Sequence, residues 1–296
     1  MHIVITGGTG FIGQALVPAL RQDQHTISIL TRQSMSSEED VDYVQAFEEI
    51  PADIPVDAVI NLAGASLADK RWTASYKREI VNSRLQTTQA MVDWLATREQ
   101  LPGVLLSGSA IGYYGQHEDE ILDEHAATNP GFAQGLCNDW EAEALKAEKL
   151  GVRTCLLRLG VVMDSGGGAF EQMSRPFRFG VGNWIGDGRQ WLSWIHRTDV
   201  IRAMQFLLAE ESLSGPFNLT APAPVTSRGF CEVMAAQRKT LVNLPMPAAL
   251  MRLALGEMAD ELLIAGQRVI PSKLQQAGFE FSYPDLDAAL SEILKG

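Results

Sequence analysis

The chain has 296 residues, enough for one large domain or two smaller ones, and 46% of them are apolar, as in ordinary globular proteins. Its 36 Asp and Glu outnumber 24 Lys and Arg, giving a net charge of −12, which argues against a nucleic-acid partner. The three cysteines, Cys137, Cys155 and Cys231, are too few and too irregularly spaced for a disulfide framework or a zinc ribbon.

No segment indicates secretion or membrane insertion. The first residues enter a strand-like run directly, without the charged region or the cleavage site of a signal peptide. The apolar stretch 246–265 is interrupted by four charged residues, so it does not predict a transmembrane helix. We therefore expect a cytoplasmic protein with no membrane partner. Few candidate ligands surround His196 and Asp199, so we expect no metal site.

Short apolar runs alternate with amphipathic stretches through the first half of the chain. The runs are at residues 3–6, 26–30, 58–62, 104–107 and 154–157, and the clearest amphipathic stretches are at 76–96 and 137–150. This alternation predicts an α/β fold with a doubly wound parallel sheet. Pro18 conflicts locally, because it removes a backbone donor from the first predicted helix.

The second half differs in composition, with many glycines between residues 160 and 190 and several prolines after 215. Such a composition indicates a smaller, more irregular lobe. We expect residues 1–160 to form a dinucleotide-binding domain, with 196–220 partly returning to its sheet. Residues 161–296 are expected to form a substrate lobe and a C-terminal extension.

The strongest motif is the glycine-rich segment ITGGTGFIG, residues 5–13, between the first predicted strand and the first predicted helix. Gly7 would allow a tight turn, Gly10 a close approach to a pyrophosphate, and Gly13 close packing of helix on strand. The helix N-terminus would add free N–H groups for the phosphates. This context favours a Rossmann-type dinucleotide site over a glycine turn without a ligand. The predicted contacts are Gly7, Thr9, Gly10, Phe11, Ile12 and Gly13.

The end of the second predicted strand indicates which dinucleotide binds. Dinucleotide folds usually place an acidic residue there for the ribose 2′-hydroxyl, but this chain has Thr31 and Arg32. A guanidinium at this point could pair with a 2′-phosphate, so we predict NADP(H) as the cofactor; the alternative is an arginine solvated at a strand end. After the third run, residues 62–64 (Leu62, Ala63 and Gly64) would line the cofactor ribose or merely form a tight turn.

These motifs resemble the extended short-chain dehydrogenase/reductase superfamily, and within it the atypical, nucleotide-sugar-epimerase-like group of NADP-dependent "epimerase family" proteins. The resemblance covers nearly the whole chain. It rests on TGGTGFIG, on residues 61–64 (NLAG), 70–72 (KRW), 107–109 (SGS), 113–115 (YYG) and 194–196 (WIH), and on the tail GQRVIPSKLQQAGFEF.

The resemblance implies a small-molecule substrate and a homodimer formed through the helices around 76–96 and 137–150. It also places Arg84 where the superfamily's catalytic tetrad has an asparagine. Arg84, and Glu79 five residues before it, would then reach the cofactor, or both are simply solvated.

The same resemblance exposes a departure in the catalytic residues. The superfamily uses a tyrosine with a lysine four residues later, and none of the five tyrosines here has one. Where the pair should fall, before Trp140, the chain has Phe132-Ala133 and Leu136-Cys137. We predict Ser109, or less favourably Ser107, as the surviving serine and Tyr114 as the substitute acid, against the alternative that all of them serve packing.

The substrate side is expected in residues 176–196. Trp184, Trp191 and Trp194 would form an apolar wall with Arg178 and Arg189 as anion-binding positions, unless the tryptophans fill a core. Together these features predict an NADP(H)-binding oxidoreductase or epimerase acting on an unidentified small substrate that is anionic in character. The alternatives are an NADPH-binding regulatory protein with little or no turnover and, disfavoured by Arg32, an NAD-dependent sugar epimerase.

Overall fold

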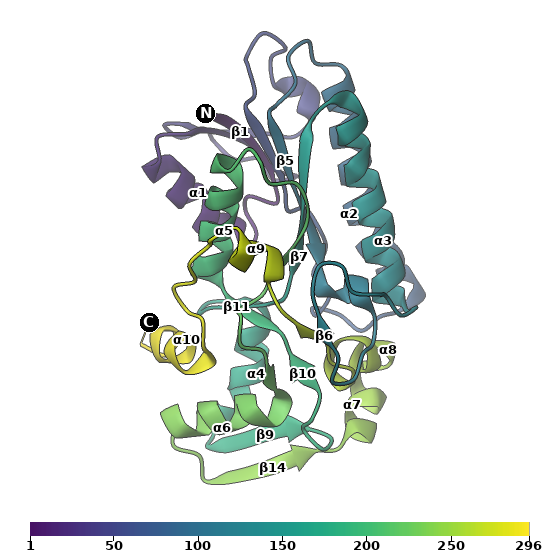
Figure 1. Ribbon diagram of the computed structural model, residues 1–296, viewed down its shortest axis with the longest axis vertical. Helices are drawn as coiled ribbons and strands as arrows, with labels where there is room; N and C mark the ends of the chain where they lie inside the picture. Colours follow the sequence, from purple (N-terminus) through teal and green to yellow (C-terminus); the bar gives the residue numbers. More distant parts are fainter. Residues whose placement is uncertain (296) are drawn as a thin grey trace.

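The computed structural model, which describes residues 1–295, is organised around a seven-stranded sheet in which all neighbouring strands are parallel (Figure 1). The spatial order is β12-β7-β5-β4-β1-β2-β3. The strands are β1 (His2–Thr6), β2 (Thr26–Leu30), β3 (Val41–Val44), β4 (Ala58–Asn61), β5 (Val104–Ala110), β7 (Arg153–Leu159) and β12 (Gly215–Leu219). The order reverses direction between β1 and β4, and open α/β sheets bind ligands beyond the carboxyl ends of strands at such a point.

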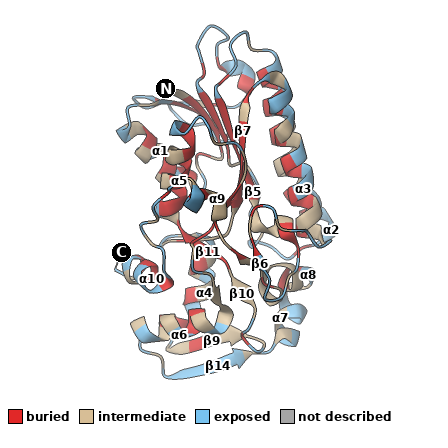
Figure 2. Ribbon diagram, viewed as in Figure 1, coloured by how far each residue is buried: buried red, intermediate tan, exposed pale blue. Residues whose placement is uncertain are grey.

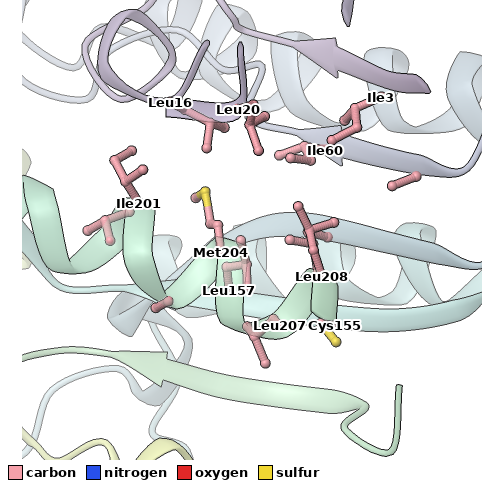
Figure 3. Packing of buried hydrophobic residues seen from close by; sticks show 14 of the residues in the cluster. Ile3, Leu16, Leu20, Ile60, Cys155, Leu157, Ile201, Met204, Leu207 and Leu208 are labelled. Atoms are coloured by element: carbon pink, nitrogen blue, oxygen red, sulfur yellow. The ribbon is translucent and has the colours of Figure 1, made fainter. Parts of the chain in front are cut away.

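Helices cover both faces of this sheet, as its side-chain alternation requires. Ile3 and Ile5 point to one face, where they pack in a core with α1 (Gly13–Gln22) and α5 (Arg197–Ala209) (Figure 3). Val4 points to the other face and packs with α2 (Ala74–Ala96) and α3 (Phe132–Ala144). The fold is therefore the predicted doubly wound α/β fold of the Rossmann type.

A smaller lobe lies beyond the carboxyl end of β7 (Figure 1). Its strands pair two by two: β8 (Val161–Met163) with β11 (Trp194–His196), β9 (Val181–Ile185) with β14 (Val242–Met246), and β10 (Trp191–Leu192) with β13 (Val225–Thr226). Its helices are α4 (Gly168–Arg178), α6 (Ser227–Gln237), α7 (Ala248–Leu255), α8 (Glu257–Ala259) with the π-helical turn Asp260–Ile264, and α10 (Leu286–Ile293). A fourth short pair, β6 (Ile121–Leu122) with β15 (Arg268–Val269), joins the two halves of the chain.

The first predicted helix is present, and α1 continues through Pro18 to Gln22. The structure departs from the expected elements in two places. The edge strand β3 was not expected, and α3 begins at Phe132 rather than 137 and ends at Ala144, followed by the 3₁₀ segment Leu145–Leu150. The predicted domain boundaries stay a prediction. Within the segment predicted as a substrate lobe and C-terminal extension, Leu274 of α9 (Ser272–Gln276) and Phe279 pack in the core of the large sheet.

The side chain of His196 caps α5 through one ring nitrogen, while its other ring nitrogen is buried without a hydrogen-bond partner among the described residues. Its Nδ1 accepts the Thr198 N–H at 3.1 Å, so Nε2 carries the proton, yet buried Nε2 has no hydrogen-bond partner among the described residues. Burial lowers the pKa of His196 below its ordinary value of 6.5, against the opposing influence of Asp164 and Asp199. Protonation would force Nδ1 to give up the capping bond.

We therefore expect acid to destabilise the fold through His196. Between the lowered pKa of the folded state and 6.5, the unfolded chain binds more protons, so the free energy of unfolding falls as the pH drops through this window. His196→Asn keeps a capping side chain that does not titrate. Urea unfolding of both proteins between about pH 7.5 and about pH 5 should show a flatter pH dependence for the variant. If the free energy of unfolding falls with pH equally in both proteins, His196 is not the source of the destabilisation by acid.

Candidate nucleotide-binding site

The glycine loop has the geometry of a phosphate cradle. Gly7 has φ +73°, and a Cβ there would lie 2.6 Å from the Leu62 carbonyl oxygen. A Cβ on Gly13 would collide with the backbone of Gly8, whereas one on Gly10 would meet only the Gly7 oxygen, at 3.2 Å. Gly7 and Gly13 thus allow strand, loop and helix to pack closely, and Gly10 leaves its side of the loop open.

Two backbone N–H groups at the start of α1 lack acceptors within residues 1–295. Its N-cap residue is Ile12, which provides no side-chain hydrogen bond, and no described residue accepts from the N–H of Phe11 or Ile12. Unpaired N–H groups at a helix N-terminus form an anion site, because they combine free donors with the positive end of the helix dipole. The loop therefore suits a phosphate-bearing ligand.

The segment after β4 is fixed against the glycine loop. Thr6 Oγ1 donates to Asn61 Oδ1 at 2.6 Å and accepts from the Ala63 N–H at 3.1 Å, while Asn61 Nδ2 donates to Thr88 Oγ1 at 2.8 Å. The Leu62 N–H also donates to the Thr6 carbonyl oxygen at 3.0 Å. These bonds place Leu62 and the residues after it beside the phosphate cradle, at the reversal point of the sheet.

Arg32 is free to bind an anion. It follows buried Thr31, whose hydroxyl accepts from the Gln33 N–H at 3.2 Å, and its own side chain is exposed. No acidic side chain within residues 1–295 forms an ion pair with it. An exposed, unpaired guanidinium beside a phosphate cradle is suited to a second phosphate group.

Arg84 and Glu79 lie on α2 in different environments. Arg84 Nη1 donates to the carbonyl oxygens of Ala65 and Ile80, at 3.0 and 3.2 Å, and its guanidinium carbon lies 5.1 Å from the centre of the Trp140 ring. A Cβ on Gly64 would come within 2.9 Å of that guanidinium carbon, so Gly64 makes room for the arginine. Glu79 is exposed and lies 3.7 Å from Lys70, so its predicted role at the cofactor stays a prediction.

The predicted serine lies in a buried polar network. Ser109 is buried at the end of β5, and its Oγ donates to Glu141 Oε1 at 2.7 Å. The Glu141 carboxylate pairs in a two-pronged geometry with Arg158, through Nε at 2.8 Å and Nη2 at 2.9 Å. Ser109 and Arg158 are register partners on β5 and β7, which explains how the sheet brings them together.

Tyr114 belongs to the same network, but its position does not support the predicted acid role. It is fully buried, its hydroxyl donates to Asn218 Oδ1 at 2.7 Å, and it accepts from Arg158 Nη1 at 3.1 Å. Burial raises the pKa of Tyr114 to about 12, far from the neutral range that suits a general acid. The neighbouring Tyr113, which sequence reasoning passed over, is half-buried and stacks on Arg158.

The segment in which the resemblance places the tyrosine and lysine contains neither residue at the expected spacing. Ala133 and Cys137 lie on α3, and burial raises the pKa of Cys137 to about 11, so its thiol remains protonated. The N-terminus of α3 is capped from the far end of the chain, because Glu261 accepts from the N–H groups of Phe132 and Ala133 at 3.4 and 3.1 Å. No tyrosine or lysine replaces the missing pair at these positions.

The three tryptophans do not form one wall. Trp194 is fully buried in the core of the smaller lobe, and its Nε1 donates to the Ala223 carbonyl oxygen at 3.1 Å. Trp184 and Trp191 are half-buried and stack beneath Arg228 and Arg268, at 5.1 and 4.3 Å from the ring centres. The predicted wall of three is therefore wrong for Trp194. Arg178 and Arg189 are exposed, as an anion-binding role requires.

Neither a metal cluster nor a membrane-spanning helix occurs within residues 1–295. Within residues 1–295, no three His, Cys, Asp or Glu side chains are grouped closely enough to hold a metal ion. In the same residues, no helix has both the length and the apolar character needed to cross a membrane.

Comparison with known proteins agrees with this geometry. A human epimerase family protein, SDR39U1, solved with NADPH, is 31% identical, and its structure covers 100% of both chains with a TM-score of 0.90. A Corynebacterium glutamicum protein, described as a nucleoside-diphosphate sugar epimerase, is 27% identical with a TM-score of 0.80, over 99% of this chain and 58% of that one.

Sequence relatives lead to the same family. Epimerase family protein SSP1921 of Staphylococcus saprophyticus is 42% identical over 99% of each chain, and Mb2239 of Mycobacterium bovis is 38% identical over 97% of this chain and 96% of its own. A domain of unknown function matches residues 246–293. The model of the NAD dependent epimerase/dehydratase family matches residues 3–219, and the chain belongs to this family.

Proposed function

We propose that the protein binds NADP(H) and acts as an oxidoreductase or epimerase of the extended short-chain reductase type on a small, anionic substrate. The observation that carries the proposal is Arg32, an exposed and unpaired guanidinium at the end of β2, next to a phosphate cradle. The human relative solved with NADPH supports the same choice. The proposed contacts are Gly7, Thr9, Gly10, Phe11, Ile12, Gly13, Thr31, Arg32, Leu62, Ala63, Gly64, Glu79 and Arg84.

Each part of the cradle would hold a different part of the nucleotide. The N–H groups of Phe11 and Ile12 would bind the pyrophosphate, and Arg32 would pair with the 2′-phosphate in charge-assisted hydrogen bonds. Arg84, held over Gly64 and stacked on Trp140, would present its remaining donors toward the same crevice. When bound, the cofactor would supply hydride chemistry, and the chain would supply orientation and exclusion of water.

The substrate is proposed to enter between the sheet and the smaller lobe. Exposed Arg178 and Arg189 give this lobe cations for an anionic group. The Corynebacterium glutamicum relative is described as acting on a nucleoside-diphosphate sugar, which is an anion of this kind.

A second candidate function has a specific observation in its favour. The hydroxyl hydrogens of Ser109 and Tyr114 are both committed to buried partners, Glu141 and Asn218, and the usual tyrosine and lysine are absent. A protein that binds NADP(H) as a regulatory signal, with little or no turnover, would need only the cradle and Arg32. The two candidates share the cofactor and differ in whether a substrate is converted.

The role of Arg32 gives a direct test of the proposed cofactor. Arg32→Ala should weaken NADPH binding about 10- to 150-fold, the effect of losing a charge-assisted pair of roughly 1.5–3 kcal/mol, and leave NADH binding nearly unchanged. Arg78→Ala is the matched control, because Arg78 is also an exposed arginine but lies on α2. It should change the affinity for neither nucleotide. Calorimetric titration measures both. An equal loss for NADPH and NADH would place Arg32 away from the 2′-phosphate.

A further inference from the structure

The side chain of Phe11 joins the glycine loop to the smaller lobe. Its ring lies across Gly167 and Gly168: a Cβ on either glycine would lie 2.8 Å from a ring carbon, on opposite edges of the ring. Arg197, the first residue of α5, holds the same residue. Its Nη1 donates to the Phe11 carbonyl oxygen at 3.1 Å, and its guanidinium carbon lies 4.6 Å from the ring centre. We call Phe11, Gly167, Gly168 and Arg197 the Phe11 clamp.

The segment that the clamp holds has little else to fix it. Residues 164–169, between β8 and the first buried residue of α4, Phe170, contain no buried residue. Three consecutive glycines stand at 166–168, and Gly166 and Gly168 have φ of +79° and +66°. Glycine loses more conformational freedom on folding than any other residue. The Phe11 ring, which takes the space that two side chains would fill, therefore selects one conformation for this segment.

The arginine of the clamp is itself held in place. Arg197 Nε donates to Asp164 Oδ2 at 2.7 Å, and both side chains are half-buried. Since Asp164 directly follows β8, this pair ties the start of the segment to the start of α5. A guanidinium over an aromatic ring is also attracted to the ring, so the ion pair and the ring contact reinforce one another.

The clamp lies at the beginning of α4. This helix starts at Gly168, buries Phe170 and Phe177 in the core of the smaller lobe, and ends at Arg178, one of the exposed cations proposed to bind the substrate. The smaller lobe is less buried than the large sheet: all four residues of β4 are buried, whereas β9 has one buried residue and β14 has none (Figure 2). Regions with few buried contacts open locally at a low free-energy cost. The position of α4 therefore depends on contacts such as the clamp.

Phe11 also belongs to the nucleotide cradle. Its N–H is one of the two donors at the start of α1 that find no acceptor among the described residues, while its carbonyl oxygen and ring are held by the clamp. A phosphate on that N–H would fix the backbone of the residue that holds the lobe. We propose that the Phe11 clamp couples nucleotide binding to the smaller lobe, so that a bound NADP(H) pyrophosphate orders residues 164–178. The coupling rests on the proposed NADP(H) binding and adds a positioning role for Phe11 and Arg197.

Coupling of this kind acts in both directions. If the nucleotide orders the segment, the clamp must strengthen nucleotide binding by the same factor, and couplings between two sites are typically about 5- to 150-fold. A contact that serves packing alone has a different consequence, because it holds the segment equally with and without nucleotide. The change that NADPH produces in the segment therefore separates the two roles.

Amide hydrogen–deuterium exchange with and without NADPH measures that change. In the unmodified protein, saturating NADPH should slow exchange at least about fivefold in residues 7–13, where the nucleotide binds, and in residues 164–178. In Phe11→Ala, at matched occupancy, residues 7–13 should remain slowed while exchange in 164–178 changes by less than about twofold. The affinity of this variant for NADPH, measured by calorimetry, should fall at least about fivefold.

Arg197→Met tests the clamp without altering the glycine loop, since Arg197 is not among the proposed nucleotide contacts. It should abolish the slowing in residues 164–178, as Phe11→Ala does. Phe179→Ala is the matched control: it removes an exposed phenyl ring directly after α4 and should leave the slowing in both segments unchanged. Thermal unfolding verifies that each variant is folded.

The outcomes distinguish the coupling from the proposed cofactor. Slowing in residues 7–13 without slowing in 164–178 of the unmodified protein would overturn the coupling and leave the proposed cofactor in place. Slowing in 164–178 that persists in either clamp variant would also overturn it, because the nucleotide would then act on that segment without the clamp. No NADPH binding in calorimetry, together with no slowing in either segment, would overturn the proposed cofactor and the coupling with it.

Discussion

Arg158→Met is expected to lower the free energy of unfolding by about 3–5 kcal/mol, because it leaves the buried carboxylate of Glu141 without its counter-charge. Both side chains are almost completely buried, 4% and 6% exposed, and the pair is joined by two hydrogen bonds. Methionine has a similar length, so the variant removes the charge while filling much of the space. Urea unfolding followed by circular dichroism measures the change.

Two controls show whether the loss comes from the uncompensated charge. Arg175→Ala breaks an exposed pair with Glu171 and should cost no more than about 1 kcal/mol. Adding Glu141→Leu to Arg158→Met removes both charges and should restore much of the lost stability. If Arg158→Met lowers the free energy of unfolding by no more than Arg175→Ala does, the buried pair does not hold β7 to α3.

Ser109→Ala is expected to reduce turnover by about 10²- to 10⁴-fold if Ser109 handles the proton of the reaction. The reaction is first sought by screening carbonyl compounds and sugar nucleotides with NADPH, followed as loss of NADPH absorbance. Ser107→Ala is the matched control: Ser107 is buried on the same strand but accepts from Asn61, at 3.4 Å, and does not contact Glu141. Ser107→Ala should keep turnover within a few fold of that of the unmodified protein.

The Ser109 and Tyr114 variants distinguish a catalytic role from a structural one. Tyr114→Phe should lower stability by about 1–3 kcal/mol, because it leaves Asn218 Oδ1 without a donor and removes one acceptor from Arg158 Nη1. Its fully buried hydroxyl predicts little change in turnover. Full activity in Ser109→Ala would show that the proton comes from elsewhere. Tight NADPH binding without turnover on any substrate would support the regulatory candidate.

Sequence patterns predicted those elements whose signals are local. The runs that became β1, β2, β4, β5 and β7 are continuous and apolar because both faces of a parallel sheet are buried. The edge strand β3 was missed because only Val41 and Val44 are buried in it and Asp42 faces solvent. The start of α3 was missed because its first N–H groups are capped by Glu261, more than 120 residues away.

In the candidate site, too, the sequence predicted the residues with local signals and missed those that depend on distant parts of the chain. The glycine loop and Arg32 could be predicted because their roles depend on positions relative to one strand and one helix. The network of Ser109, Glu141 and Arg158 could not, because it depends on the register of β5 with β7 and on the packing of α3. One signal was available: Arg158 directly follows the apolar run 154–157, and an arginine inside a buried strand requires a partner.

Calorimetric titration of the unmodified protein with NADPH and with NADH tests most directly whether this cradle is built for NADP(H). The exposed guanidinium of Arg32 at the end of β2 predicts that NADPH binds at least about tenfold more tightly, since a charge-assisted pair with the 2′-phosphate exists for NADPH alone. Equal affinities, or tighter binding of NADH, would contradict the assignment.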